Sequence, residues 1–217
     1  MASADNHLPH QAKSVSTSDS ANLIGGSQNG QGKPHGPWTV LQSSTKYQDP
    51  WLLVVRDEVV RPDGLPGSYC VVHLKHGVCV IALDESGTIH LTKEFHYGVG
   101  RTTIEGASGG REAEEPALET AQRELKEELG ISAEIWIDLG VTDPFTANVV
   151  SPTQMYLAMN LTFGETELEG TEQIERYSIP FHEAVRMVLE SEITHSPSCL
   201  AILKAQHHLS QQAAGNP

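Results

Sequence analysis

The sequence predicts an α+β fold in which strands and helices are mixed. Three observations predict this class. β-branched and aromatic residues fill the first half of the chain, one strongly amphipathic helical segment lies at 116–129, and further strands lead into two helical patterns at the carboxyl end. Because the strands and helices do not alternate regularly, a doubly wound parallel sheet is not expected.

The 217 residues divide into a polar start and a longer, more apolar remainder. Residues 1–36 are mainly Ser, Asn, Gln, Gly and His and have no periodic apolar positions. Burial could not offset the entropy of ordering such a segment, so we expect a disordered tail at 1–36. The remainder, 37–212, has the size of one domain around a single core.

The printed sequence contains no pattern typical of a membrane span or a secretory signal. A span requires roughly 20 consecutive apolar residues, and a signal peptide requires a basic region followed by a short apolar one. We therefore expect a soluble, cytoplasmic protein with no membrane partner. Its three cysteines are far apart and include no C-x-x-C pair, which favours reduced core cysteines over disulfides or zinc ligands.

The chain is strongly acidic, with a formal net charge of -14. Nucleic acid is not expected as a partner, because no cluster of Lys and Arg could displace the counterions of its backbone. A small phosphorylated substrate would also be repelled unless divalent cations were bound between it and the protein. Carboxylate clusters are how proteins hold such cations.

The first half of the chain is predicted to form strands joined by short turns. Apolar and β-branched runs predict β structure at 38–61, with a dense apolar run at 51–55, and strands at 68–74, 78–83 and 88–95. The turn-forming residues at 61–64 predict a hairpin after the first strand. The short connections at 76–77 and 84–87 predict a meander through the other three.

The second half begins with one well-delimited helix. Pro116 is expected as its first residue, and Gly130 as its stop after Leu129. An apolar stripe suited to docking on a sheet runs through Leu118, Ala121, Leu125 and Leu129. Further strands are expected at 133–141, 154–163 and 176–179, and helices at 182–190 and 198–209.

A complete motif covers the segment from residue 109 to residue 131. It has the pattern G-x5-E-x7-R-E-U-x-E-E-x-G-U, where U is aliphatic. Every defined position is filled, by Gly109, Glu115, Arg123, Glu124, Leu125, Glu127, Glu128, Gly130 and Ile131. An E-L-K-E-E run alone is typical of a solvated helix face, but the complete motif argues against that interpretation.

Three carboxylates of this motif are expected to crowd together. On a helix Glu124 and Glu128 lie one turn apart, and Glu127 lies between them in angle, away from the apolar stripe. Like charges at this spacing repel one another. The arrangement therefore favours a site that gains a cation, and carboxylates together with phosphate oxygens are ligands suited to Mg²⁺.

The motif resembles the Nudix box, so the chain is similar to Nudix hydrolases. The resemblance implies a Nudix fold, with a mixed β-sheet sandwiched between helices. It also implies hydrolysis of a phosphoanhydride bond in a nucleoside diphosphate linked to another group, X. The implied cofactor is Mg²⁺, with Mn²⁺ as a possible substitute.

The resemblance also assigns roles within the box. Glu124 and Glu128 would be the main metal ligands, and Glu127 a further ligand or water-orienting group. Arg123 would fix a glutamate by ion pairing. Glu115 would begin the helix and Gly130 would end it. Gly109 would allow a tight turn, so that a backbone carbonyl near Ser108 could join the metal shell.

Segments outside the box resemble the ADP-ribose/ADP-sugar pyrophosphatase branch. They lie at 47–51, 61–69, 92–97, 169–172, 180–184 and 192–194. In this branch Glu172 would be a catalytic carboxylate on a mobile loop, and Arg101 and Glu105 would contact substrate or metal-bound water. The branch also implies an N-terminal antiparallel β extension and a homodimer that exchanges N-terminal strands. The products would be AMP and a sugar phosphate.

Three departures from the branch pattern leave alternatives open. Ala107 replaces a proline, His96 replaces an arginine, and the stretch 148–154 lacks an Asp-Glu pair. The substrate could instead be another diphosphate, such as GDP-mannose or a dinucleotide, or a nucleoside triphosphate. The chain could also be a catalytically silent Nudix domain that binds a nucleotide. Glu172 could be an ordinary surface glutamate, and Arg101 and Glu105 a surface ion pair.

Overall fold

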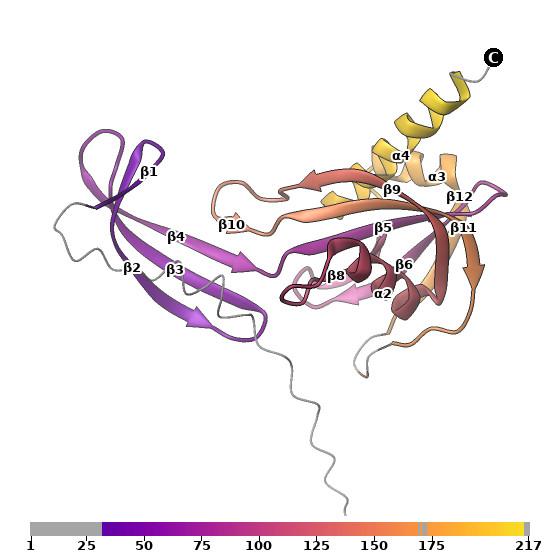
Figure 1. The fold of residues 1–217 in the computed structure, drawn as a ribbon, viewed down its shortest axis with the longest axis horizontal. Helices are drawn as coiled ribbons and strands as arrows, with labels where there is room; N and C mark the ends of the chain where they lie inside the picture. Colours follow the sequence, from indigo (N-terminus) through magenta and orange to yellow (C-terminus); the bar gives the residue numbers. More distant parts are fainter. Residues whose placement is uncertain (1–31, 169, 171–172, 215–217) are drawn as a thin grey trace, which may run out of the picture. The chain divides into compact units, whose positions relative to one another are not determined.

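The computed structural model describes residues 32–168, 170 and 173–214. The chain forms two compact units, Met1–Leu74 and Lys75–Pro217, which we describe separately (Figure 1). The first strand, β1 (Lys33–His35), falls inside the segment expected to be a tail. The rest of that segment, 1–31, lies outside the described residues.

The first unit is an antiparallel sheet in the chain order β1, β2 (Trp38–Gln48), β3 (Leu52–Val60) and β4 (Pro66–Leu74). The hairpin predicted at 61–64 is confirmed, and it joins β3 to β4. Gly64 adopts φ 81°, and the Arg61 guanidinium pairs with Asp63 at 2.6 Å across the turn. This unit is the expected N-terminal β extension.

The second unit contains a mixed sheet with the order β12-β6-β5-β11-β9, to which β7 and β8 add at β6 and β5 (Figure 1). The strands of this sheet are β5 (Gly77–Leu83), β6 (Thr88–His96), β7 (Arg101–Glu105), β8 (Ala107–Gly110), β9 (Ile131–Thr142), β11 (Thr153–Phe163) and β12 (Glu175–Pro180). The unit also contains the short strand β10 (Val149–Val150), which is not part of this sheet. β11 pairs with β5 in parallel, and the other pairs within this sheet are antiparallel. The predicted α+β class with a mixed sheet is confirmed.

The predicted meander through β4, β5 and β6 is wrong. β4 and β5 belong to different sheets, although only two residues separate them. β5 pairs with β6 at only two positions, and its other partners are β11 and β8. β5 is buried along almost its whole length, so it recruits partners from distant parts of the chain, which local β propensity does not reveal.

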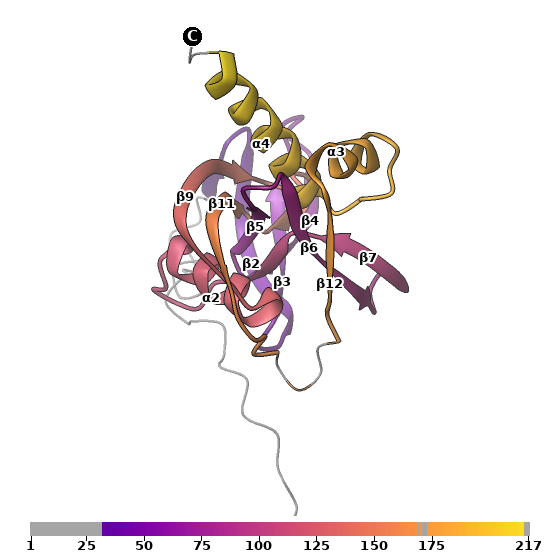
Figure 2. The same cartoon turned by 90° about the vertical axis from the view of Figure 1, so that its right-hand side faces the viewer.

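Helices cover both faces of this sheet (Figure 2). Alternate residues of β5 enter two separate apolar clusters, as the two-residue period of a strand requires. The cluster that contains α2 (Ala117–Leu129) includes Val78, Val80, Ala82, Ala121, Leu125 and Leu129. The cluster that contains α3 (Phe181–Leu189) and α4 (Ser196–Ala214) includes Cys79, Ile81, Leu83, Ala184, Ala201 and Ile202.

The ends of α2 follow the expected residues with one shift. Pro116 has φ -62° and ψ 140°, so it precedes the first helical residue instead of being that residue. Gly130 ends the helix in the left-handed conformation at φ 60°. Leu118 was wrongly assigned to the buried stripe, since it is exposed, and the first turn instead buries Thr120, whose hydroxyl donates to the Pro116 carbonyl.

Within the described residues, no helix has the length and apolar character needed to cross a membrane.

Candidate active site

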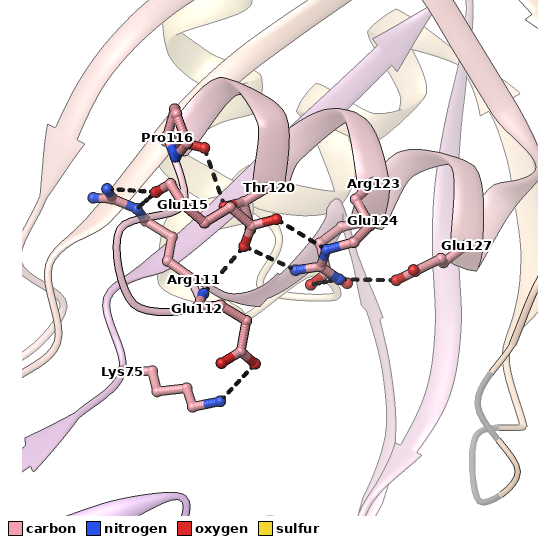
Figure 3. Close-up of polar contacts among 9 residues, drawn as sticks. All are labelled: Lys75, Arg111, Glu112, Glu115, Pro116, Thr120, Arg123, Glu124 and Glu127. Atoms are coloured by element: carbon pink, nitrogen blue, oxygen red, sulfur yellow. Dashed lines mark hydrogen bonds and ion pairs between the residues drawn. The ribbon is translucent and has the colours of Figure 1, made fainter. Parts of the chain in front are cut away.

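Arg123 of α2 binds three glutamates of the box (Figure 3). Its Nη1 lies 2.8 Å from Glu124 Oε1 and 2.9 Å from Glu127 Oε2, and its Nε lies 3.2 Å from Glu115 Oε1. Burial lowers the pKa of the guanidinium, but the three carboxylates outweigh it and raise the pKa above its usual range. One permanently charged side chain therefore fixes three acidic ones.

Glu115 ties the loop before α2 to the body of the helix. Its carboxylate accepts from Arg123 and from the backbone N–H of Glu112, while its carbonyl accepts from Arg111 (Figure 3). Burial raises the pKa of Glu115, but these hydrogen bonds outweigh burial and hold the pKa below its ordinary value. Glu115 stands in the loop just ahead of α2, where the box resemblance placed the start of the helix.

Glu128 is directed toward β8. Its side chain is buried, with the residue only 9% exposed, and its Oε2 accepts from the backbone N–H of Ser108 at 3.1 Å. Ser108 lies opposite Cys79 in the antiparallel pairing of β8 with β5. The strand and the helix are therefore joined at the two positions, 108 and 128, that the sequence assigned to one metal shell.

Gly109 is required by a close approach, and the tight turn expected at this position is wrong. The residue lies in strand β8, paired with Val78, and a Cβ added to it would stand 2.1 Å from Glu124 Oε1. No side chain larger than hydrogen fits there unless Glu124 moves. The Glu124 carboxylate therefore fills the space where a side chain at position 109 would lie.

The sequence did not predict β7 and β8. The two strands carry four of the predicted site residues, namely Arg101, Glu105, Ser108 and Gly109. Arg101 begins β7, and its guanidinium donates to Thr194 Oγ1 at 2.6 Å. Glu105 ends β7 and is 8% exposed, with His96 and His195 as partners, so an ion pair with Arg101 at the surface is not what the structure contains.

Two family models match the chain in succession. The nucleoside diphosphate sugar hydrolase N-terminal domain matches residues 38–72, and the NUDIX domain matches residues 73–197, which is more than half of the chain. The chain belongs to the Nudix family.

Two curated relatives indicate which branch of the Nudix family this protein belongs to. It is 31% identical over 169 residues to an ADP-ribose pyrophosphatase of Mycobacterium tuberculosis, covering 75% of this chain and 80% of the relative. It is 29% identical over 150 residues to an ADP-ribose pyrophosphatase of Bacillus subtilis, covering 67% and 80%. The chain is a Nudix pyrophosphatase of the ADP-ribose/ADP-sugar pyrophosphatase-like branch.

A solved structure supports the fold of the Nudix protein. The crystal structure of an ADP compounds hydrolase superposes with a TM-score of 0.71 at 19% identity, covering 83% of this chain and 98% of the other. At that identity the match bears on the fold alone. The predicted Nudix fold is confirmed.

Nudix hydrolases generally use divalent metal ions, and the donors on α2 are of the chemical type that such an ion takes. Glu124, Glu127 and Glu128 carry hard carboxylate oxygens within the segment 124–128 of one helix, and the Glu124 carboxylate fills the space where a side chain at Gly109 would stand. Among the described residues, no three His, Cys, Asp or Glu side chains converge in metal-binding geometry. Arg123 and the Ser108 amide engage these carboxylates instead.

Glu172, the expected catalytic carboxylate, lies outside the described residues. Two other features lie beside the carboxyl end of α2. The Glu167 backbone N–H donates to the Glu127 carbonyl, and Lys126 pairs with the Glu167 carboxylate at 2.7 Å. A hollow of about 430 Å³, which the sequence did not indicate, is lined by Gln122, Arg123, Lys126, Glu127, Ser132, Ala133, Trp136 and Glu167.

Proposed function

We propose that this Nudix pyrophosphatase hydrolyses ADP-ribose or an ADP-sugar with Mg²⁺ as cofactor, giving AMP and a sugar phosphate. The observation that carries the proposal is the joint between β8 and α2. There Glu128 is buried against the Ser108 amide, and Glu124 fills the space that Gly109 leaves. The names of the two curated relatives support ADP-ribose as the first substrate to test.

Each site residue has a role in this proposal. The carboxylates of Glu124 and Glu128, with Glu127 and a carbonyl near Ser108, would hold the metal ion. When bound, Mg²⁺ supplies positive charge to the diphosphate oxygens and lowers the pKa of a coordinated water. Arg123 keeps Glu124 and Glu127 in place for this work.

The reaction itself is a hydrolysis in which a water oxygen bonds to one phosphorus. The bond from that phosphorus to the bridging oxygen breaks, and the bridging oxygen leaves as part of the second phosphate. Glu127 or Glu172 would orient the water and accept its proton. Arg101 and Glu105 would contact the substrate at the edge of the site.

A substrate panel tests the proposal. ADP-ribose, ADP-sugars, GDP-mannose, a dinucleotide and a nucleoside triphosphate are each incubated with Mg²⁺ or Mn²⁺, and products are separated by anion exchange. We expect AMP release to be fastest from an ADP compound. If only another diphosphate were hydrolysed, the proposed ADP substrate would be rejected. The proposed reaction, hydrolysis of a phosphoanhydride bond, would still stand.

Glu128→Gln provides the matched control for that panel. The amide has nearly the same shape and can still accept from Ser108, but it lacks the charge that a metal ion requires. We expect kcat to fall by about 10²- to 10³-fold, as for the loss of one group that stabilises transition-state charge. Unchanged turnover in the variant would indicate that the measured activity does not come from this site.

The alternative of another diphosphate is favoured by one observation. His96, at the position where the branch has an arginine, has its Nε2 3.2 Å from Glu105 Oε1. A histidine in place of an arginine reduces the number of donors that face a phosphate group. The panel above therefore includes substrates outside the ADP series.

A further inference from the structure

A polar cluster that is buried at Thr103, Glu105 and Ser198 connects β7 to the start of α4. It consists of Glu105, His96, His195, Ser198 and Thr103. Glu105 Oε1 lies 3.2 Å from His96 Nε2 and accepts from Thr103 Oγ1 at 2.6 Å, while its Oε2 lies 3.0 Å from His195 Nδ1. We call this set the Glu105 cluster.

His195 has two partners at a single nitrogen. Its Nδ1 lies 3.0 Å from Glu105 Oε2 and 2.8 Å from Ser198 Oγ. Ser198 is fully buried and its Oγ accepts from the backbone N–H of Gly106 at 2.8 Å. A hydrogen on His195 Nδ1 can therefore be shared between two groups. One is the carboxylate of Glu105, a residue of β7, and the other is the Ser198 hydroxyl, which the Gly106 amide holds in place.

One arrangement of protons satisfies the whole chain of contacts. Nδ1–H of His195 is shared between Glu105 and the Ser198 oxygen, the Gly106 N–H donates to the same Ser198 oxygen, and the Ser198 hydroxyl hydrogen points to the Cys79 sulfur, 3.6 Å away. This arrangement needs only one hydrogen on the His195 ring, at Nδ1. Burial lowers the pKa of His195, although Glu105 opposes this effect, which is consistent with a neutral ring.

Gly106 links the Glu105 cluster to the contact between β8 and α2, the helix that carries the box glutamates. It is the single residue between β7 and β8, and it is packed so closely on β5 that an added Cβ would stand 2.7 Å from the Val80 carbonyl oxygen. Two residues later, the Ser108 amide binds Glu128. A shift of the Gly106 amide would therefore move the donor that orients Glu128.

We propose that His195 is a positioning residue of this enzyme, which orients Glu105 for substrate on one side and, through Ser198 and Gly106, Glu128 for metal on the other. The part of the inference that concerns Glu105 and substrate rests on the proposed function. The metal half stands on the contacts of Ser198, Gly106, Ser108 and Glu128 alone. His195 comes from the loop before α4, far from the box in sequence, so no motif spacing reveals it.

The test compares His195→Leu with His195→Asn. The leucine has no hydrogen-bonding group, whereas the asparagine amide nitrogen can take the place of Nδ1. We expect His195→Leu to raise the Kd for Mn²⁺, measured by calorimetry without substrate, by about tenfold, as for loss of a residue that orients a metal ligand. The KM for the diphosphate hydrolysed by the wild type should rise by a similar factor, and His195→Asn should restore both to within about threefold.

Two further variants separate the halves of the proposal. Glu105→Gln should raise KM and leave the Mn²⁺ Kd unchanged. Ser198→Ala should raise the Mn²⁺ Kd, because the Gly106 amide loses its acceptor, and Ser198→Thr should retain the hydroxyl and the affinity. His207→Ala, at an exposed position of α4, is the control.

Several results would overturn the inference. These are wild-type Mn²⁺ affinity in both His195→Leu and Ser198→Ala, or equal losses in His195→Leu and His195→Asn. If His195→Leu does not fold, as judged by circular dichroism, the Ser198 pair decides the metal half. Failure of the proposed function is distinct, since it appears as absence of AMP from every ADP compound while the Mn²⁺ titrations still give an answer.

Discussion

Gly109 and Glu124 illustrate how tightly single residues are constrained in this site. The glycine lies in a regular strand with no positive φ, so its backbone conformation does not explain it. The explanation is the Glu124 carboxylate, which occupies the volume where a side chain at 109 would stand. At the scale of residues, the box therefore contains positions that are determined by packing.

Gly109→Ala should therefore impair metal binding. The added Cβ would stand 2.1 Å from Glu124 Oε1, so the carboxylate must move. We expect activity to fall by about tenfold or more, a change that a misplaced catalytic group of this kind causes. The metal concentration for half-maximal activity should rise.

The neighbouring glycine is a matched control for that measurement. A Cβ at Gly110 would meet the flexible side chain of Lys75, whose Cδ lies 3.1 Å away and can move. Gly110→Ala should keep near wild-type activity. Equal losses in the two variants would mean that the strand, and not Glu124, is what alanine disturbs.

At the scale of elements, α2 is held at both ends by contacts that its own sequence does not supply. The amino end is held by the Arg111 and Glu115 contacts of the preceding loop. At the carboxyl end, Arg176 of β12 donates to the Leu129 carbonyl and stacks its guanidinium 5.5 Å from the centre of the Phe163 ring. The helix that carries the carboxylates is thus fixed relative to the sheet.

Gly130→Ala should destabilise this helix end. The residue adopts φ 60°, and an added Cβ would stand 2.5 Å from the Gly164 carbonyl oxygen. We expect the free energy of unfolding to fall by about 2 kcal/mol or more, since strain in the left-handed region adds to a backbone clash. Urea unfolding followed by circular dichroism measures the change.

Gly87→Ala isolates the clash from the conformational strain. Gly87 also has a positive φ, of 81°, but an added Cβ would have nothing within 4 Å. This variant should lose about 1 kcal/mol, which is the cost of a left-handed residue with a side chain. A loss at Gly87 as large as at Gly130 would show that the contact with Gly164 is unimportant.

The electrostatics of the molecule as a whole determine how its stability depends on pH. His90 is buried between Asp84 and Ser178, at 3.2 Å and 2.8 Å. Burial lowers its pKa, although Asp84 opposes this effect. Below about pH 6.5 the unfolded chain binds a proton at this residue and the folded chain does not, so stability is lost as the pH falls toward the folded-state pKa.

The free energy of unfolding should therefore decrease between pH 7.5 and pH 5.5. The slope that His90 contributes is at most about 1.4 kcal/mol per pH unit, the value for a difference of one proton. His90→Gln should reduce the slope, which urea unfolding at several pH values measures. An identical slope in the variant would assign the pH dependence to other groups, such as His73, whose pKa is also lowered by burial.

Assembly is the other property of the whole molecule that can be tested. Several large apolar side chains of the first unit are more than half exposed, namely Leu41, Tyr47, Trp51 and Leu65. Exposed apolar groups of this kind are typical of a surface that binds another protein chain. We propose that they contribute to the homodimer expected from the family resemblance.

Light scattering after size-exclusion chromatography tests this proposal. We expect a dimer for the wild type and a monomer, or a mixture, for the double variant Leu41→Glu and Leu65→Glu. Leu189→Glu, at a position 71% exposed on α3, should leave the dimer intact. A monomeric wild type would contradict the proposal.

The sequence by itself determined the parts of this protein that depend on local spacing. The box predicted α2 and its carboxylates, Gly130 predicted the helix end, and the residues at 61–64 predicted the hairpin. It also predicted the family, because every defined position of the box was filled. These features can be predicted from the sequence because the residues that form each of them lie close together in the chain.

Only the tertiary structure decided which distant segments meet. It placed β5 between β8 and β11 and not in a meander, and brought Gly109 against Glu124. It also brought His195 to Glu105 from a loop 90 positions later in the chain. No periodicity encodes such contacts, because they arise when the buried faces of the sheet and helices are packed against one another.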